Sequence, residues 1–148
     1  MCAQPKQVDL FRVDGYLAVI LFLAFFVRLA DLAVPSHYPQ PDELFSLDVA
    51  SEPFIGESLR RLASDTHPPL YFLILRYWLK VTSKTLFSAK VLSIIFNVAN
   101  ILFTYFFCQI WVDKRTARWA ALFMALSPWN IYWAHLSRNH QMLPPLFT

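Results

Sequence analysis

The chain has 148 residues, of which 57% are hydrophobic and 17% aromatic, while 16% are charged and mean hydropathy is +0.41. This balance is far from that of a soluble globular domain and is typical of a membrane protein. The net charge of +3 is spread along the chain without a basic run, which excludes an ordinary nucleic-acid-binding surface. With two glycines, the chain holds neither a Walker loop nor a dinucleotide-binding turn.

The first expected membrane helix covers residues 16–34, after a short N-terminal segment, 1–15. Its apolar run of about 19 residues is long enough to cross a bilayer. Bulky and charged residues stand at its end in place of a small-residue cleavage site, so we expect a retained helix and not a cleaved signal peptide. Arg28 and Asp31 lie three residues apart on one face, and we expect them to pair or to reach the nearby interface.

An acidic pair follows in "HYPQPDELFSLD", residues 37–48. Pro41, Asp42 and Glu43 are typical of the first turn of a helix, and that helix should end at Pro53. Carboxylates at this position interact favourably with the helix dipole, and this is a sufficient structural explanation for the acidic pair. The functional alternative is a carboxylate at the membrane surface that accepts a proton from a substrate hydroxyl.

The segment "HPPLYFLILRYWLKV", residues 67–81, is apolar but carries Arg76 and Lys80 four residues apart on one face. Its uncharged run is too short for about 30 Å of hydrocarbon, so we expect a helix that lies on the outer surface. His67 precedes two prolines that start this helix, and taken alone it is more typical of a turn than of a site.

The second expected membrane helix is 91–112, and the third is 119–136. The loop between them, 113–118, is basic and by the positive-inside tendency belongs in the cytoplasm, which places 1–15 inside and 35–90 outside. The external segment 137–148 then includes the start of a fourth helix. One polar face of the second helix should look into a helix bundle, and it consists of Ser93, Asn97, Asn100 and Thr104.

Four stretches in this order resemble the GT-C superfamily of polytopic glycosyltransferases, in particular protein O-mannosyltransferases and the lipid A aminoarabinose transferase. A first helix ends near an arginine in "FFVRLADL", and an acidic pair opens the external loop in "PDELF". "HPPLYFLILRYWLKV" is close to the family's HPPLYYLLL, and "ALFMALSPWNIYWAHLSR" is similar to its LALSPFHIWYSQEAR. The resemblance implies an all-α integral membrane protein: the N-terminal portion of a GT-C fold, with about three transmembrane helices, external juxtamembrane helices and the start of a fourth.

The resemblance also implies a multi-pass enzyme of the cell membrane that transfers a sugar from a polyprenyl phosphate to a hydroxyl acceptor. Asp42 matches the catalytic base, with Glu43 as its neighbour. His67 falls where the family places residues near the donor phosphate or a bound metal, so a divalent metal held by Asp42, Glu43 and His67 is an open alternative. Arg138 matches the arginine of QEAR, whereas Leu136 replaces its glutamate.

Family members are several hundred residues long, so we expect this chain to be their N-terminal part, a fragment or a truncated reading frame with negligible activity alone. Its expected partners are the bilayer, the lipid-linked sugar donor, and the missing C-terminal part or partner helices. Two other readings stay open. The polar face of 91–112 suits a small non-catalytic protein that associates with other helices, and charges inside a membrane helix suit a transporter fragment.

Overall fold

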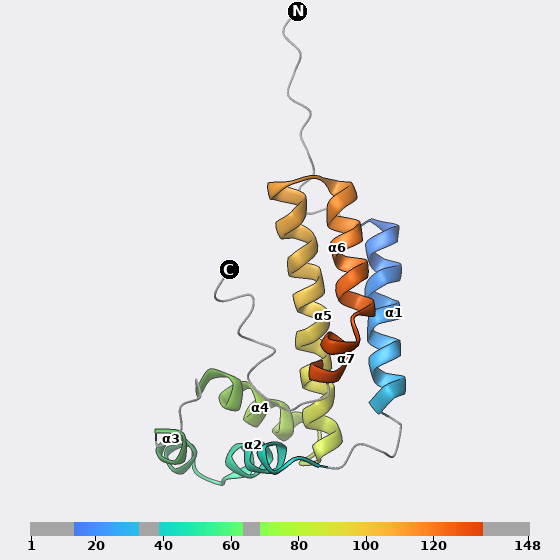
Figure 1. Cartoon of the computed structure of the whole chain (residues 1–148). Helices are drawn as coiled ribbons and strands as arrows, with labels where there is room; N and C mark the ends of the chain where they lie inside the picture. The colour runs from blue at the N-terminus through green and yellow to red at the C-terminus, as the bar shows by residue number, and fades with distance from the viewer. Residues whose placement is uncertain (1–13, 33–38, 64–68, 135–148) are drawn as a thin grey trace, which may run out of the picture.

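The computed structural model describes residues 14–32, 39–63 and 69–134. This part of the chain is entirely helical, with seven α-helices and no strand, so the expected all-α class is confirmed. Three helices, α1 (Gly15–Leu32), α5 (Leu86–Trp111) and α6 (Lys114–Leu126), run side by side as a bundle (Figure 1). Three others, α2 (Pro41–Ser51), α3 (Ile55–Ala63) and α4 (Pro69–Val81), form a layer at one end of it, which we call the end layer.

Two helices in the described ranges, α1 and α5, are long and apolar enough to cross a membrane. The 26 residues of α5 correspond to about 39 Å, which exceeds the hydrocarbon thickness. This helix begins before the predicted residue 91 because the Thr85 side chain caps it by accepting a hydrogen bond from the Ser88 N–H. Its first turns therefore extend into the end layer.

Small side chains let α6 approach its neighbours closely. Ala117, Ala121 and Ala125 recur every four residues, and all three are buried against α1 and α5. Bundle helices without a hydrophobic driving force between them pack best through such small residues. The core that results also contains Leu17, Ile20, Ala24, Ile101 and Tyr105.

The third expected span, 119–136, is not one continuous helix in the structure. Helix α6 ends at Leu126, Ser127 is extended with ψ of 120°, and the short helix α7 (Pro128–Ala134) follows. Pro128 explains the break, because proline lacks the N–H that would continue the ladder and disfavours a helical conformation in the residue before it. The expected loop 113–118 is also largely helical, since the Asp113 side chain caps α6 from Lys114 onward.

The end layer crosses the bundle direction and does not continue it (Figure 1). Helix α4 has 13 residues and is not a candidate span. The position of 67–81 on the outer surface stays a prediction. Helix α2 begins at Pro41 and ends just before Pro53, as predicted. A separate core joins α2, α4 and the start of α5, with Val49, Tyr71, Leu75 and Ala89 at its centre.

The two charges expected on one face of α4 have different environments. Lys80 is exposed, but Arg76 is 5% exposed and donates hydrogen bonds to the Glu52 and Pro53 carbonyl oxygens at 2.6 and 2.9 Å. It also donates to Ser58 Oγ at 3.1 Å. A cation suits the carbonyl groups that a helix leaves unpaired at its C-terminus. Arg76 therefore stabilises the end of α2 and its junction with α3.

A charge cluster closes the opposite end of the bundle. Asp14, just before α1, accepts from Lys114 Nζ at 2.6 Å and from Arg118 Nη2 at 2.8 Å, and the Tyr105 hydroxyl donates to it at 3.2 Å. Chiefly through the hydrogen bonds from Lys114 and Arg118, the pKa of Asp14 falls from 3.8 to about 2. The start of α1 and the basic turn 113–118 therefore lie at the same end.

Asp14→Asn should make the bundle less sensitive to acid. A carboxylate with a lowered folded-state pKa contributes stability that is fully present above about pH 4 and is lost as the pH falls toward 2. We expect the difference in thermal unfolding midpoint between the native chain and Asp14→Asn to shrink across this interval. Glu57→Gln, an exposed acid on α3, serves as the control, and a constant difference from pH 5 to 2 would contradict the role assigned to Asp14.

Candidate active site

The two carboxylates of the acidic pair point into different environments. Asp42 is exposed, whereas Glu43 is 1% exposed, because adjacent residues of a helix face directions about 100° apart. Glu43 Oε2 accepts from the Gln40 N–H at 3.1 Å, and the Glu43 N–H donates to the Gln40 carbonyl at 3.0 Å. Glu43 thus performs the helix-start role that the sequence suggested for the pair.

A second buried charge faces Glu43. Lys90 Nζ of α5 lies 3.5 Å from Glu43 Oε2, and the two side chains are 7% and 1% exposed. Lys90 is the last residue of the predicted external segment 35–90, and the sequence analysis assigns it no role. Its spacing could have revealed it, since Lys90 comes three residues before Ser93 and seven before Asn97, on the polar face of the same helix.

Tyr71 of α4 lies beside this pair. Its hydroxyl is 3.3 Å from Ser93 Oγ, and both residues are buried. Burial raises the pKa of Tyr71 well above its ordinary value, and the negative charge of Glu43 acts in the same direction. The phenol therefore stays protonated and serves as a hydrogen-bonding group.

The polar face of α5 continues inward to Arg28. Arg28 is 0% exposed, and its Nε donates to Asn97 Oδ1 at 2.7 Å. The expectation that Arg28 reaches the interface is therefore wrong: the guanidinium is buried among polar groups of the bundle, which satisfy it better than hydrocarbon would. The predicted polar face of α5 does look into the bundle: Ser93 and Asn97 are fully buried and Asn100 is buried. Its fourth member, Thr104, is half-buried.

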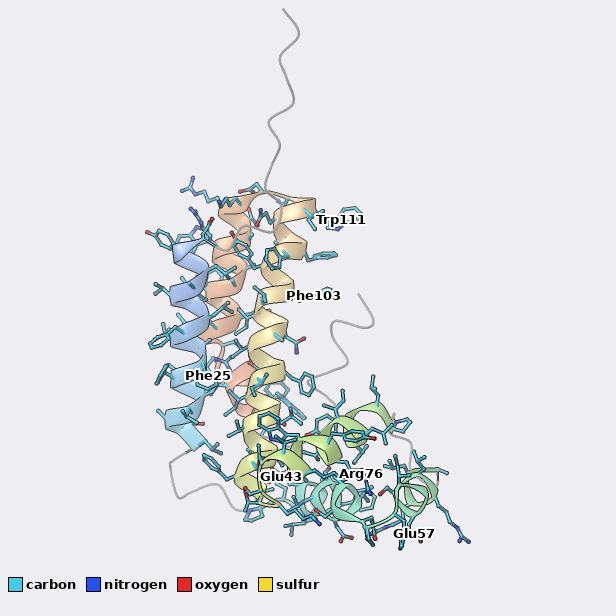
Figure 2. The ribbon with its side chains drawn as sticks, turned by 180° about the vertical axis from the view of Figure 1, so that it is seen from behind. Phe25, Glu43, Glu57, Arg76, Phe103 and Trp111 are labelled. Atoms are coloured by element: carbon cyan, nitrogen blue, oxygen red, sulfur yellow. The ribbon has the colours of Figure 1, made fainter. Side chains whose placement is uncertain are left out.

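Helix α7 brings aromatic side chains to the same end of the bundle. The Gln40 side-chain amide donates to the Tyr132 hydroxyl at 3.4 Å, which connects the residue before α2 with α7. Trp133 packs edge-on against both Trp129 and Tyr132, with ring centroids 5.5 and 5.9 Å apart. Figure 2 shows Glu43 and Arg76 in the end layer, far from Trp111 at the other end.

The remaining predictions about the site concern His67, Arg138 and a possible metal. His67 and Arg138, predicted to bind the donor, lie outside the described residues, as does Leu136. Within the described ranges no group of three His, Cys, Asp or Glu side chains could hold a metal ion. Glu43 also fits the suggested metal poorly, because its carboxylate already accepts the Gln40 N–H and faces Lys90.

Lys90→Met should destabilise the end layer by about 3 to 5 kcal/mol, because it leaves the buried Glu43 carboxylate without its cation. We expect the double variant Lys90→Met with Glu43→Gln to recover much of this loss, as measured by denaturant unfolding in detergent. Lys84→Met, an exposed lysine just before α5, is the matched control. Equal effects of Lys90→Met and Lys84→Met would contradict a buried ion pair.

Comparison with known proteins agrees with the helical membrane architecture. The family model described as dolichyl-phosphate-mannose-protein mannosyltransferase matches residues 66–147. This range covers more than half of the chain and includes α4, α5, α6 and α7, whereas the acidic pair of α2 lies before it. Comparison with curated proteins and with solved structures finds no significant match. On the family match, the chain belongs to the dolichyl-phosphate-mannose-protein mannosyltransferase family, a group of GT-C type membrane glycosyltransferases.

Proposed function

We propose that this chain contributes the catalytic base to a glycosyltransferase that uses a sugar linked to a polyprenyl phosphate. The acceptor hydroxyl attacks the anomeric carbon while Asp42 takes its proton. The new bond from carbon to the acceptor oxygen forms as the bond to the phosphate oxygen breaks, and the lipid phosphate leaves with the electron pair. Transfer by direct displacement inverts the anomeric centre.

The observation that carries this proposal is the division of roles between Asp42 and Glu43. Glu43 is occupied by the helix start and by Lys90, whereas Asp42 is exposed at the first turn of α2. A general base must be able to reach the proton it removes, and a positioned base contributes roughly a hundredfold to ten-thousandfold in rate. Of the pair, Asp42 is the exposed member and Glu43 the buried one, which supports the assignment of Asp42 as the base.

Cations are needed to hold the phosphate that leaves. His67 and Arg138 are the residues proposed for this task by family resemblance, since a charge that develops on a leaving group is stabilised by nearby donors. The range matched by the family model, 66–147, contains both. We assign no step to a metal ion, because Glu43 is already engaged by Lys90 and the Gln40 N–H.

We propose that the acidic turn faces the outside of the cell membrane and that the N-terminus is cytoplasmic. Two observations support this arrangement. The start of α1 and the basic residues Lys114 and Arg118 share one end through Asp14, and cytoplasmic ends are enriched in Lys and Arg. The end layer with Asp42 lies at the other end of α5, a helix long enough to cross the bilayer.

The alternative of a non-catalytic protein that binds partner helices was based on the polar face of α5. In the structure Ser93 contacts Tyr71, and Asn97 contacts Arg28 and Asn130. The face is therefore used within the chain. The transporter alternative rests on Arg28 and Asp31 inside a membrane helix. Arg28 is bonded to groups of the bundle, so its charge is also used within the chain.

Asp42→Asn should lower sugar transfer about a hundredfold to ten-thousandfold with little change in stability, because the base is lost from an exposed position. The assay uses the longest natural protein that contains this chain, with a lipid-linked sugar donor and a hydroxyl acceptor. Asp48→Asn, another exposed acid of α2, is the control. Transfer by Asp42→Asn at the native rate would show that the base lies elsewhere.

Cysteine labelling tests the orientation separately. With Cys2 and Cys108 replaced, Gly56→Cys in the end layer should react with a membrane-impermeant maleimide in intact cells. Arg115→Cys, exposed at the other end of α5, should react only after permeabilisation. The reverse pattern would place the acidic turn in the cytoplasm and contradict the proposed orientation.

A further inference from the structure

The buried Arg28 donates hydrogen bonds to acceptors on three helices. Its Nη1 donates to the carbonyl oxygens of Ala24 and Ala125 at 3.0 and 3.1 Å, and its Nη2 donates to the Met124 carbonyl at 3.4 Å. With the bond from Nε to Asn97, the guanidinium joins α1, α5 and α6. The planar fork of arginine suits such a junction, because its donors point in fixed directions.

Two of these acceptors belong to the last turn of α6. The final carbonyl groups of a helix have no partner within the helix and carry the negative end of its dipole. Arg28 supplies a cation there, and the Asn130 side-chain amide donates to the same Met124 carbonyl at 3.0 Å. The break at Ser127 is thus stabilised from two sides, by α1 and by α7.

Asn97 connects Arg28 to α7. Its Oδ1 accepts from Arg28, so its Nδ2 is left to donate, and it does so to Asn130 Oδ1 at 2.7 Å and to the Asn130 carbonyl at 3.3 Å. Because arginine can only donate, the orientation of the Asn97 amide is determined by Arg28. Asn130 therefore meets a donor and not an acceptor.

Two residues beyond Asn130, Tyr132 accepts the hydrogen bond from Gln40 at the start of α2. We propose that Arg28 is a positioning residue: through Asn97 and Asn130 it sets the direction of α7 after the break, and so holds α7 against the acidic turn. Its importance for catalysis rests on the proposed function, but the geometry can be tested without any transfer assay.

The test measures distances between spin labels on the 148-residue chain in nanodiscs, with the native cysteines replaced. One pair, Leu44→Cys and Trp129→Cys, uses exposed positions of α2 and α7. A second pair, Val19→Cys and Val112→Cys, reports on the opposite end of the bundle, also from exposed positions. Pulsed electron paramagnetic resonance gives the distance distribution of each pair.

Arg28→Met removes every donor of the junction, and we expect the 44–129 distribution to broaden about twofold while 19–112 stays as in the native chain. Arg28→Lys should give an intermediate width, since an ammonium keeps the charge but cannot reach all four acceptors in fixed directions. Thr104→Val is the control, because Thr104 lies on the same face of α5 but bonds to Asn100 and Met124 Sδ and not to Arg28.

Asn97→Asp separates positioning from general loss of packing. A carboxylate still accepts from Arg28, but it turns an acceptor toward the two Asn130 oxygens that Asn97 now serves, so α7 should be released while Arg28 stays bound. Broadening of the 44–129 pair alone in this variant supports the proposal. An unchanged 44–129 pair in Arg28→Met, or equal broadening of both pairs in Asn97→Asp, would overturn it.

Discussion

Buried polar groups need hydrogen-bonding partners where water is absent, and the rest of this structure depends on this constraint. Helix α5 carries Lys90, Ser93, Asn97 and Thr104 on one face, in a segment otherwise apolar enough to span a bilayer. Water cannot satisfy such groups inside hydrocarbon, so neighbouring helices must. Each group therefore selects a neighbour: α2 through Glu43, α4 through Tyr71, α1 and α7 through Asn97, and α6 through Met124.

The same constraint explains why an adjacent pair of acids can have two roles. Glu43 is turned inward and meets a cation and a backbone N–H, so its charge is used in the structure. Asp42 is turned outward and remains accessible. The structural role of Glu43 is therefore compatible with the catalytic role proposed for Asp42, because the two side chains point in different directions.

Contacts at both ends of α2 determine where the acidic turn lies. Hydrogen bonds from Arg76 stabilise the end of the helix and a contact from Gln40 to Tyr132 joins its start to α7. Helix α7 can reach that point because the helix breaks at Ser127, just before Pro128, and the chain changes direction there. A continuous third span would have carried Tyr132 further along the α6 axis. The break is thus part of what places the acidic turn.

Several elements could be predicted from local pattern. The hydropathy of 16–34 and 91–112 corresponds to α1 and α5, Pro41 begins α2, and the spacing of Ser93 and Asn97 indicates a buried face. The break at Ser127 was also visible in "LSPWN", since proline disfavours helix in the residue before it, but hydropathy averaged over a span hides a single residue. The burial of Arg76 and Lys90 could not be predicted, because hydropathy alone does not identify a buried partner.

The sequence by itself determined the class of the protein, its principal helices and the family resemblance, because composition, periodicity and ordered motifs are properties of the chain. Tertiary structure alone decided which charges are buried and with whom. Glu43 and Lys90 are 47 residues apart, Arg28 and Asn97 are 69 apart, and Gln40 and Tyr132 are 92 apart. Contacts over such separations depend on how helices pack, and local propensity carries no information about them.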